Sequence, residues 1–346
     1  MRAIVKYARG AGNVDLREIP EPTPGPGQVK VEVKAAGLCG SDLHIYHDQI
    51  AIPIRPPVVM GHEFAGVIVE LGEGVKHLRV GDRVTCETTA FFCGECLPCH
   101  LGYYNLCPSR QVLGYAVDGC FAKYCVVHER QVHLLPDSID FVSAALTEPL
   151  ACCVHAVLEM TRPTAGDVVV ISGPGPIGLL CLQLIKVAGG LVVMCGTSQD
   201  EKRLEMASRL GADLTVNVET EDVQRLIGRL TTRSQGADLF FECSGAPAAA
   251  RLGLTITRPG GQYTQVGLFP GPIDLPFDLI AYKELRVTGS VGQRRTSWDR
   301  SLTLLAQGLV DTKSLISHTL PLTEWDTAFR LYEERTSLKI VLMPVD

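Results

Sequence analysis

The fold of this chain is decided by the stretch Val168-Val169-Val170-Ile171-Ser172-Gly173-Pro174-Gly175-Pro176-Ile177-Gly178-Leu179-Leu180. An apolar run with strand character leads into the pattern G-x-G-x-x-G, and an apolar run with helix character follows it. The glycine pattern alone is weak evidence, but between a strand and a helix it predicts a turn that binds a dinucleotide. Gly173 makes the turn, Gly175 lets a pyrophosphate approach the backbone, and Gly178 lets the helix pack closely on the sheet. Pro176 and Ile177 begin the helix, whose N-terminus favours phosphate.

The residues after this turn continue the alternation of strands and helices. Helices are expected at Ile177–Ala188 and at Glu201–Leu210, where apolar residues recur at helical spacing. Apolar runs predict strands at 191–195, 214–218, 239–243 and 263–266. Strands that are apolar on both faces and alternate with helices indicate a parallel, doubly wound sheet. We therefore expect an α/β protein in which residues 152–289 form a dinucleotide-binding Rossmann domain.

The first 151 residues have a different pattern of apolar and polar residues. Short alternating runs such as Val29–Val33 and Phe64–Val69 are separated by Gly and Pro. This pattern is typical of short antiparallel strands in a compact β domain. After Ser290 the sequence predicts one helix, Trp298–Gln307, and a last strand, Lys339–Met343, that rejoins the first domain. Residues 1–151 and 290–346 are therefore expected to form one β-rich domain.

The composition is that of an ordinary globular protein and argues against several functions. The 346 residues include 32 Lys and Arg against 38 Asp and Glu, for a net charge of −6. No basic run is present, so nucleic acid is not an expected partner. No apolar run approaches the roughly 18 residues of a membrane helix, and no apolar signal segment is visible, so we expect no membrane partner and a cytoplasmic protein. In that setting, 13 cysteines indicate metal ligands rather than a disulfide framework.

Four cysteines form the strongest motif. Cys93, Cys96, Cys99 and Cys107 follow the spacing C-x2-C-x2-C-x7-C, among Gly and Pro residues that permit tight turns. Four thiolates at this spacing can enclose zinc, and a site with four protein ligands is structural rather than catalytic. An iron–sulfur cluster is the rival, but the ferredoxin run has its fourth cysteine sooner after the third. A set of free thiols is the remaining alternative.

A second set of metal-binding side chains is scattered through the first domain. Cys39 follows a predicted strand, His62 and Glu63 precede another, and Glu148 falls near the domain boundary. None of them is informative alone. Together they offer a thiolate, an imidazole and carboxylates, which suits zinc with an open fourth position.

The order of these motifs resembles the zinc-dependent medium-chain alcohol dehydrogenases over essentially the whole chain. The Cys39 segment, Gly61-His62-Glu63, the four-cysteine lobe and the glycine turn occur in that family's order. The sequence is most similar to the polyol (sorbitol) and threonine dehydrogenase branch, because Glu148 stands where the other branch carries a second cysteine. The resemblance implies a GroES-like catalytic domain at 1–151 and 290–346, a homotetramer, and hydride transfer between a secondary alcohol or polyol and NAD(P). An L-threonine 3-dehydrogenase-like or 2,3-diol dehydrogenase activity stays open.

The resemblance also assigns roles to residues of the first domain. Cys39, His62 and Glu148 would hold a catalytic zinc ion, and Glu63 would lie close enough to exchange with one of the ligands. Ser41 and His44 match the family's relay, which carries the proton of the substrate hydroxyl to solvent by way of the cofactor ribose. A histidine that titrates near neutrality suits the end of such a relay.

Two other classes compete with this interpretation. A zinc-free quinone reductase shares the fold but would lack Cys39, His62 and the four-cysteine lobe. A non-catalytic zinc-binding scaffold would account for the lobe, but it would leave the glycine turn and the second ligand set unexplained.

The residues after the second strand of the dinucleotide domain bear on the choice of cofactor. NAD-specific sites place an Asp or Glu there, about 20 residues beyond the glycine turn, for the ribose 2′-hydroxyl. This chain instead has Gly196, and the hydroxyls and cations that follow can bind a 2′-phosphate: Thr197, Ser198, Lys202 and Arg203. We expect NADP to be accepted, with a slight lean toward it over NAD. Residues at later strand ends complete the expected cofactor site: Ser244, Val266, Gly267, Leu268, Ser290 and Val291.

Overall fold

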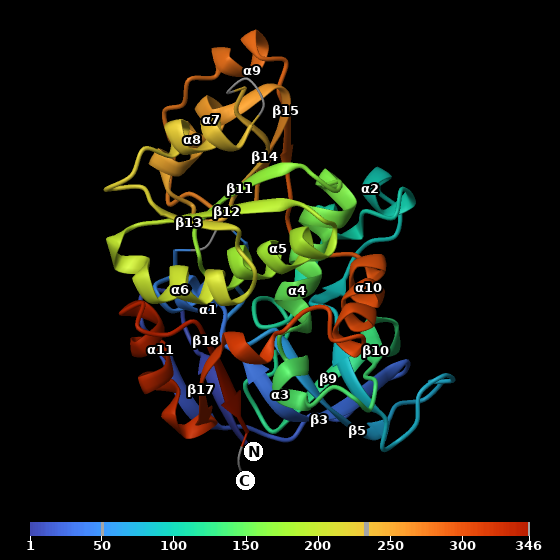
Figure 1. Cartoon of the computed structure of the whole chain (residues 1–346). Helices are drawn as coiled ribbons and strands as arrows, with labels where there is room; N and C mark the ends of the chain where they lie inside the picture. The colour runs from blue at the N-terminus through green and yellow to red at the C-terminus, as the bar shows by residue number, and fades with distance from the viewer. Residues whose placement is uncertain (50–51, 232–234, 345–346) are drawn as a thin grey trace. The chain divides into compact units, whose positions relative to one another are not determined.

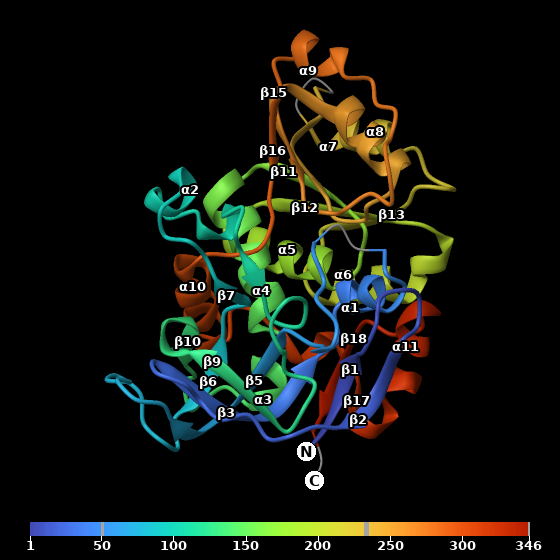
Figure 2. The same cartoon turned by 180° about the vertical axis from the view of Figure 1, so that it is seen from behind.

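The computed structural model describes residues 1–49, 52–231 and 235–344 and divides after Ala151. Unit 1 comprises Met1–Ala151, Gln293–Gly308 and Thr312–Asp346. Unit 2 comprises Cys152–Gly292 and Leu309–Asp311. Figures 1 and 2 show the chain from opposite sides, with unit 2 in yellow-green to orange.

Unit 2 is built on a six-stranded parallel sheet with the strand order β13-β12-β11-β14-β15-β16. Its strands are β11 Val168–Ser172, β12 Leu191–Gly196, β13 Leu214–Asn217, β14 Ala237–Glu242, β15 Thr257–Gln265 and β16 Arg286–Gly289. The chain steps from β11 out to β13 and then returns to β14 on the other side, so the strand order reverses between β11 and β14. All five residues of β11 are buried, as expected for an unbroken apolar run. The α/β fold class with a doubly wound sheet is therefore confirmed.

Helices cover both faces of this sheet. They are α5 Pro176–Val187, α6 Glu201–Arg209, α7 Val223–Leu230, α8 Pro247–Ile256 and α9 Asp278–Tyr282, with a π-helical segment, η3, at His155–Thr161. Ile227 of α7 and Leu254 of α8 share one core with Phe240 of β14. Figure 1 shows α5 and α6 on the opposite side of β11 and β12 from α7 and α8. The glycine turn between β11 and α5 therefore opens at the carboxyl edge of the sheet.

Unit 1 holds a seven-stranded sheet with the order β10-β6-β5-β3-β18-β17, in which β9 also pairs with β3. Its strands are β3 Gln28–Gly37, β5 Glu63–Leu71, β6 Arg83–Cys86, β9 Tyr124–His128, β10 Val132–Leu134, β17 Ile316–Pro321 and β18 Lys339–Met343. β1 Arg2–Lys6, β2 Val14–Glu18 and β4 Val58–Val59 form a smaller sheet, and β7 Thr89–Phe91 pairs with β8 Gln111–Val112. β18 pairs antiparallel with β3 through Val341 and Gly37, which confirms that the last strand rejoins the first part of the chain.

The helices of unit 1 range from four to 12 residues. They are α1 Gly40–Tyr46, α2 Leu97–His100, α3 Phe141–Ala144, α10 Arg295–Ala306 and α11 Trp325–Glu333, and α4 Thr147–Val154 begins in unit 1. Short 3-10 turns lie at Tyr104–Leu106, Glu129–Gln131, Ser198–Asp200, Lys313–Leu315 and Leu322–Glu324. No helix in the described ranges is long and apolar enough to cross a membrane.

The prediction of a single helix after Ser290 is wrong. The structure has α10 where that helix was expected, but also α11 and the strand β17. The apolar residues of α11 recur at helical spacing: Ala328 and Phe329 are buried, and Trp325, Leu331 and Tyr332 pack against the same core. This spacing indicates an amphipathic helix, so the pattern was present in the sequence and the prediction missed it.

Candidate functional site

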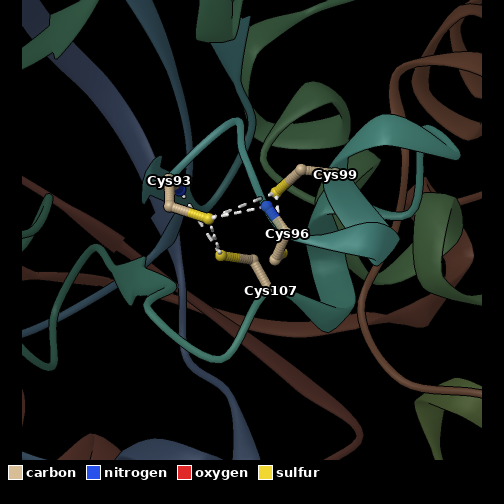
Figure 3. Close-up of side chains that lie close together, drawn as sticks. All are labelled: Cys93, Cys96, Cys99 and Cys107. Carbon is tan, nitrogen blue, oxygen red and sulfur yellow. Dashed lines mark hydrogen bonds between the residues drawn. The ribbon is translucent and has the colours of Figure 1, made fainter.

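The four-cysteine lobe brings its sulfur atoms together. All four lie within 4.8 Å of one another, between the paired strands β7 and β8 (Figure 3). Cys93 Sγ is 4.0 Å from Cys99 Sγ and 3.5 Å from Cys107 Sγ, and Cys96 Sγ is 3.4 Å from Cys99 Sγ. Four sulfurs around zinc, with bonds of about 2.3 Å, form a tetrahedron with edges of about 3.8 Å. The lobe therefore fits a zinc ion.

The acidity of these thiols is uneven. Backbone N–H groups of Glu95 and Cys96 lower the pKa of Cys93 to about 6, and burial raises the pKa of Cys99 to about 12. Thiols this close do not all ionise together unless a cation compensates their charge. A bound metal ion is therefore needed for all four cysteines to be thiolates at once.

A second group consists of Cys39, His62 and Glu63, whose ligand atoms also lie within 4.8 Å of one another. Cys39 precedes the first residue of α1, just after β3, and Glu63 begins β5. The antiparallel pairing of β3 with β5 sets Gly37 opposite Glu63, which brings the two segments side by side. His62 is 4% exposed and Glu63 0%.

Buried charge surrounds this second group. Asp42 accepts the Cys39 backbone N–H at 2.9 Å, and its other carboxylate oxygen lies 3.7 Å from His62 Nδ1, which has no hydrogen-bond partner among the described residues. Lys339 Nζ donates to Glu63 Oε1 at 2.7 Å. Burial acts to lower the pKa of His62, but the charge of Asp42 and the hydrogen bond and charge of Cys39 raise it to about 10. A cluster that draws a proton onto a buried imidazole provides the setting that a divalent cation needs.

Glu148 lies near this group but outside it. The residue is on α4 and is 8% exposed, and its Oε1 accepts a hydrogen bond from Gln293 Nε2 at 3.2 Å. Burial raises the pKa of Glu148 to about 7, against the opposing charge of His62. The two side chains therefore influence each other electrostatically, although the Glu148 carboxylate does not belong to the 4.8 Å group.

The two expected relay residues differ in position. Ser41 Oγ lies 3.4 Å from His62 Nε2, so the hydroxyl reaches the metal group. His44 is exposed on α1, and the structure does not bring it into the group.

Sequence reasoning missed three residues of this site: Asp42, Tyr115 and Lys339. Tyr115 is buried, with its ring centroid 5.5 Å from that of His62. Asp42 stands three residues after Cys39, a spacing typical of a helix cap, and this signal was available. Tyr115 and Lys339 come from distant segments, and nothing in the sequence around them points to the site.

The dinucleotide turn has the geometry that its glycines predict. Gly173 has φ +92°, and a Cβ there would lie 2.8 Å from the Cα of Ser244. A Cβ at Gly178 would lie 2.0 Å from the carbonyl oxygen of Gly173, so the helix packs on the turn without side chains between them. At Gly175, which caps α5, a Cβ would meet nothing within 4 Å. The turn therefore leaves open space at the helix N-terminus, where Pro176 and Ile177 follow.

The end of β12 is more acidic than the sequence pattern suggests. Thr197 N and Oγ1 donate to Asp200 Oδ2 at 3.0 and 2.8 Å, and Ser198 N donates to Glu219 Oε2 at 3.0 Å. Arg203 lies 3.6 Å from the other oxygen of Asp200, and Lys202 is exposed. The sequence has no acidic residue at position 196, but Asp200 and Glu219 place carboxylates beside Thr197, Ser198 and Arg203, which were expected around a 2′-phosphate.

The remaining expected cofactor residues gather at the carboxyl ends of β14, β15 and β16. A Cβ at Gly267 would lie 2.5 Å from the backbone nitrogen of Gly245, so the turn after β14 lies against the turn after β15. Leu268 is 79% exposed, and Ser290 N donates to the carbonyl oxygen of Gln265 at 3.0 Å. Ser244, Val266, Gly267, Leu268, Ser290 and Val291 thus all lie along one edge of the sheet of unit 2.

Comparison with known proteins agrees with this arrangement. Residues 25–137 match the alcohol dehydrogenase GroES-like domain, and residues 176–307 match the zinc-binding dehydrogenase domain. The chain is 46% identical to a sorbitol dehydrogenase of Halalkalibacterium halodurans over all of both chains. It is 38% identical to a D-arabitol-phosphate dehydrogenase of Enterococcus avium over 99% of this chain and 97% of the relative. A zinc-binding dehydrogenase of Sinorhizobium meliloti 1021, solved bound to NADP, superposes with a TM-score of 0.92 at 32% identity over 99% of both chains.

A dinucleotide turn on a doubly wound sheet, together with a buried group that requires a cation, defines a metal-dependent dehydrogenase. The chain belongs to the zinc-binding alcohol dehydrogenase family, in the branch that contains sorbitol and arabitol-phosphate dehydrogenases. It is an alcohol or polyol dehydrogenase that uses NAD(P), which confirms the class predicted from the sequence and rules out the scaffold and the quinone reductase.

Proposed function

We propose that this enzyme oxidises a secondary alcohol or polyol to the ketone at a zinc ion held by Cys39, His62 and Glu148. In this proposal residues 1–151 and 290–346 form the catalytic domain, and residues 152–289 form the dinucleotide domain. The observation that carries the proposal is the buried group of Cys39, His62 and Glu63 among acidic side chains. Zinc at this position supplies a Lewis acid that lowers the pKa of a substrate hydroxyl. The lobe of Cys93, Cys96, Cys99 and Cys107 holds a second, structural zinc.

Two buried partners orient the ligands of the catalytic group. The carboxylate of Asp42 lies 3.7 Å from His62 Nδ1, so its charge favours a proton on that nitrogen and leaves Nε2 as the atom that would bind the metal. Lys339 holds Glu63 in a buried ion pair, so Glu63 approaches the metal only when that pair loosens. Glu148 is then the third permanent ligand, and Glu63 is the one that exchanges with it.

The proton of the substrate hydroxyl leaves through Ser41 and His44. Ser41 Oγ is within reach of the metal group, and His44 is exposed on the same short helix. A proton can leave a dry pocket when a hydroxyl inside the site passes it on to an imidazole that is in contact with solvent.

Both cofactors are accepted, with a slight lean toward NADP over NAD. Gly196 removes the carboxylate that usually repels a 2′-phosphate, and Lys202 and Arg203 follow in the next turn. Asp200 and Glu219 oppose this preference, which keeps it small. Thr197 and Ser198 donate to these carboxylates and hold them in place, and the Arg203 cation beside Asp200 partly offsets its charge.

The enzyme is a homotetramer of the cytoplasm. β16 is the last strand of its sheet and, among the described residues, pairs with β15 alone. Val287 on this strand is 45% exposed, and Phe277 and Tyr282 just before it are 66% and 82% exposed. An exposed strand edge with apolar neighbours is a surface for pairing with a second copy. Light scattering measures the assembly directly, and a monomeric mass would reject it.

The test of the proposed function is an activity panel with both cofactors. The zinc-loaded enzyme is assayed for cofactor reduction with sugar alcohols, 2,3-diols, threonine, simple secondary alcohols and ethanol. Secondary carbinols, with ketone products, should give the highest kcat/KM. A clear preference for primary alcohols across the panel would reject the proposed substrate class.

A further inference from the structure

Glu242, the last residue of β14, has a carboxylate that is completely buried at the end of the sheet in unit 2. It accepts Ser172 Oγ at 3.2 Å from the end of β11 and Gln265 Nε2 at 2.7 Å from the end of β15. It also accepts the backbone N–H groups of Ser244 at 2.9 Å and Gly245 at 3.0 Å, and the Ser244 hydroxyl. Two backbone N–H groups and the Gln265 amide, which can only donate here, therefore supply both carboxylate oxygens with hydrogen bonds. The sequence analysis did not include this residue in the site.

Two turns close directly over this carboxylate. Gly245 has φ +67°, and a Cβ there would lie 2.4 Å from the carbonyl oxygen of Leu268. A Cβ at Gly267 would lie 2.6 Å from Glu242 Oε2 itself. The segments 244–246 and 266–268 therefore approach each other and the carboxylate closely at Gly245 and Gly267, and the hydrogen bonds of the carboxylate fix the first segment.

Glu242 lies at the point of the sheet where the strand order reverses. Ser172 and Glu242 end β11 and β14, the two neighbouring strands between which the strand order reverses. A dinucleotide binds across the carboxyl ends of the strands at this reversal. Its adenosine half belongs to the side of β12, where the ribose-binding position falls, so its nicotinamide half belongs to the side of β14, β15 and β16.

We propose that Glu242 is a positioning residue that shapes the nicotinamide half of the cofactor site, and that its buried charge favours the oxidised cofactor over the reduced one. The inference rests on the proposed dinucleotide binding of unit 2. The oxidised nicotinamide ring carries a positive charge and the reduced ring is neutral. A buried carboxylate beneath the two turns acts through protein rather than water, so its charge reaches the ring with little screening.

The test measures binding rather than turnover. Dissociation constants are determined by calorimetry on the zinc-loaded full chain, without substrate, for NAD, NADH, NADP, NADPH and ADP-ribose. In Glu242→Gln the ratio of the oxidised to the reduced dissociation constant should rise by about fivefold or more, while the constant for ADP-ribose, which lacks nicotinamide, should change by less than about twofold. Glu242→Asp, which keeps the charge, should retain the ratio of the parent.

Asp238 supplies the matched control. It lies on the same strand at the opposite end, where it accepts the Val168 backbone N–H at 2.8 Å and pairs with Arg258 at 2.6 Å. Asp238→Asn therefore removes the same charge from the same strand, away from the carboxyl edge, and should leave the ratio of the oxidised to the reduced constant unchanged.

Four results would overturn the inference. An equal weakening of all ligands in Glu242→Gln would give the residue a purely structural role, and an unchanged ratio would remove its electrostatic effect. If Glu242→Gln does not fold, Gln265→Lys serves as the second variant, because it places a cation against the same carboxylate. The ratio of the oxidised to the reduced dissociation constant should rise in Gln265→Lys as well, and an unchanged ratio in this variant would overturn the inference. If the parent chain binds none of the dinucleotides, the proposed function itself is contradicted, and this inference with it. The measurement on the parent alone distinguishes this outcome from the others.

Discussion

Lys339 Nζ lies 2.7 Å from Oε1 of Glu63, and both side chains are buried, at 2% and 0% exposure. The pair joins the last strand of the chain to β5 at the edge of the metal group. Burial acts to lower the pKa of Lys339, but the charges of Glu63 and Cys39 raise it above its ordinary value. The ammonium therefore stays charged at neutral pH and balances part of the acidic cluster.

Replacing this lysine should be costly. In Lys339→Met the Glu63 carboxylate remains buried without its partner, so we expect the free energy of unfolding to fall by about 3–5 kcal/mol. Urea denaturation of the zinc-saturated enzyme measures the change. Lys339→Arg keeps the charge and serves as the control that should lose much less. A loss of less than about 1 kcal/mol in the methionine variant would mean that Glu63 finds another partner.

The two metal groups should be separable by mutation. Cys39→Ser should bind one zinc fewer per chain and lose turnover, while its thermal unfolding changes little, because the lobe and both sheets are intact. Cys96→Ser should also lose one zinc but unfold at a lower temperature, since the three thiols that remain within 4.8 Å of one another then lack the cation that joins them. Metal analysis and calorimetry on both variants check this. Iron and sulfide in the parent, or a single zinc, would contradict the two-zinc assignment.

Zinc binding at the Cys39 group should depend on pH with a definite sign. The pKa of His62 in the metal-free chain is raised to about 10, so the imidazole holds a proton at neutral pH and must release it to bind zinc. The protonated ring stabilises the metal-free fold fully below its ordinary pKa of 6.5, and this contribution is lost as the pH rises toward 10. Competition with a zinc chelator should therefore give an affinity that falls by at least about tenfold for each pH unit between 8 and 6, and more steeply below 7, where Glu148, whose pKa is raised to about 7, must also release a proton. An affinity that is constant over this range would place the proton elsewhere.

The sequence predicted what depends on local pattern. The run from Val168 to Gly178 was sufficient to place a strand, a turn and a helix, because the whole pattern lies in one segment: Gly173 and Gly178 are required by close backbone contacts, and Gly175 leaves open space at the helix N-terminus. The cysteine lobe was equally clear, because all of its ligands lie in one short segment.

Features that depend on packing between distant segments did not follow from the sequence. Lys339 reaches Glu63 only because β18 pairs with β3, which in turn pairs with β5. Glu242 shows the same limit, since its donors come from the ends of three strands that are far apart in the chain. The helix α11 is different, because its apolar residues recur at helical spacing within one short segment and could have been recognised there.

The proposed lean toward NADP can be tested at one exposed cation. Lys202 is exposed and follows the end of β12, so Lys202→Ala should weaken NADP binding by about three- to tenfold, while NAD binding changes by less than about twofold. Arg209→Ala removes the same charge from the other end of α6 and is the control. Calorimetric titration of both variants with both cofactors checks the difference. If the parent favours NAD by a hundredfold or more, Asp200 or Glu219 has taken the place of the missing acid and the interpretation of Gly196 is wrong.

His44 provides the last test, because its exposure makes its role separable from the stability of the fold. The side chain lies on α1, three residues after Ser41, whose hydroxyl is 3.4 Å from His62 Nε2. If the imidazole delivers the proton to solvent, His44→Ala should lower the rate of alcohol oxidation by about 10- to 100-fold at pH 7. The loss should shrink as the pH approaches 10, because hydroxide then accepts the proton directly. His47→Ala is the matched control, since His47 ends the same helix and is paired with Glu333, so its removal should leave the shape of the pH profile unchanged. The measurement is kcat against pH from 6 to 10 for the parent and both variants, with the substrate that the panel identifies. A profile for His44→Ala that runs parallel to that of the parent would take His44 out of the proton path and leave Ser41 to deliver the proton to water by another route.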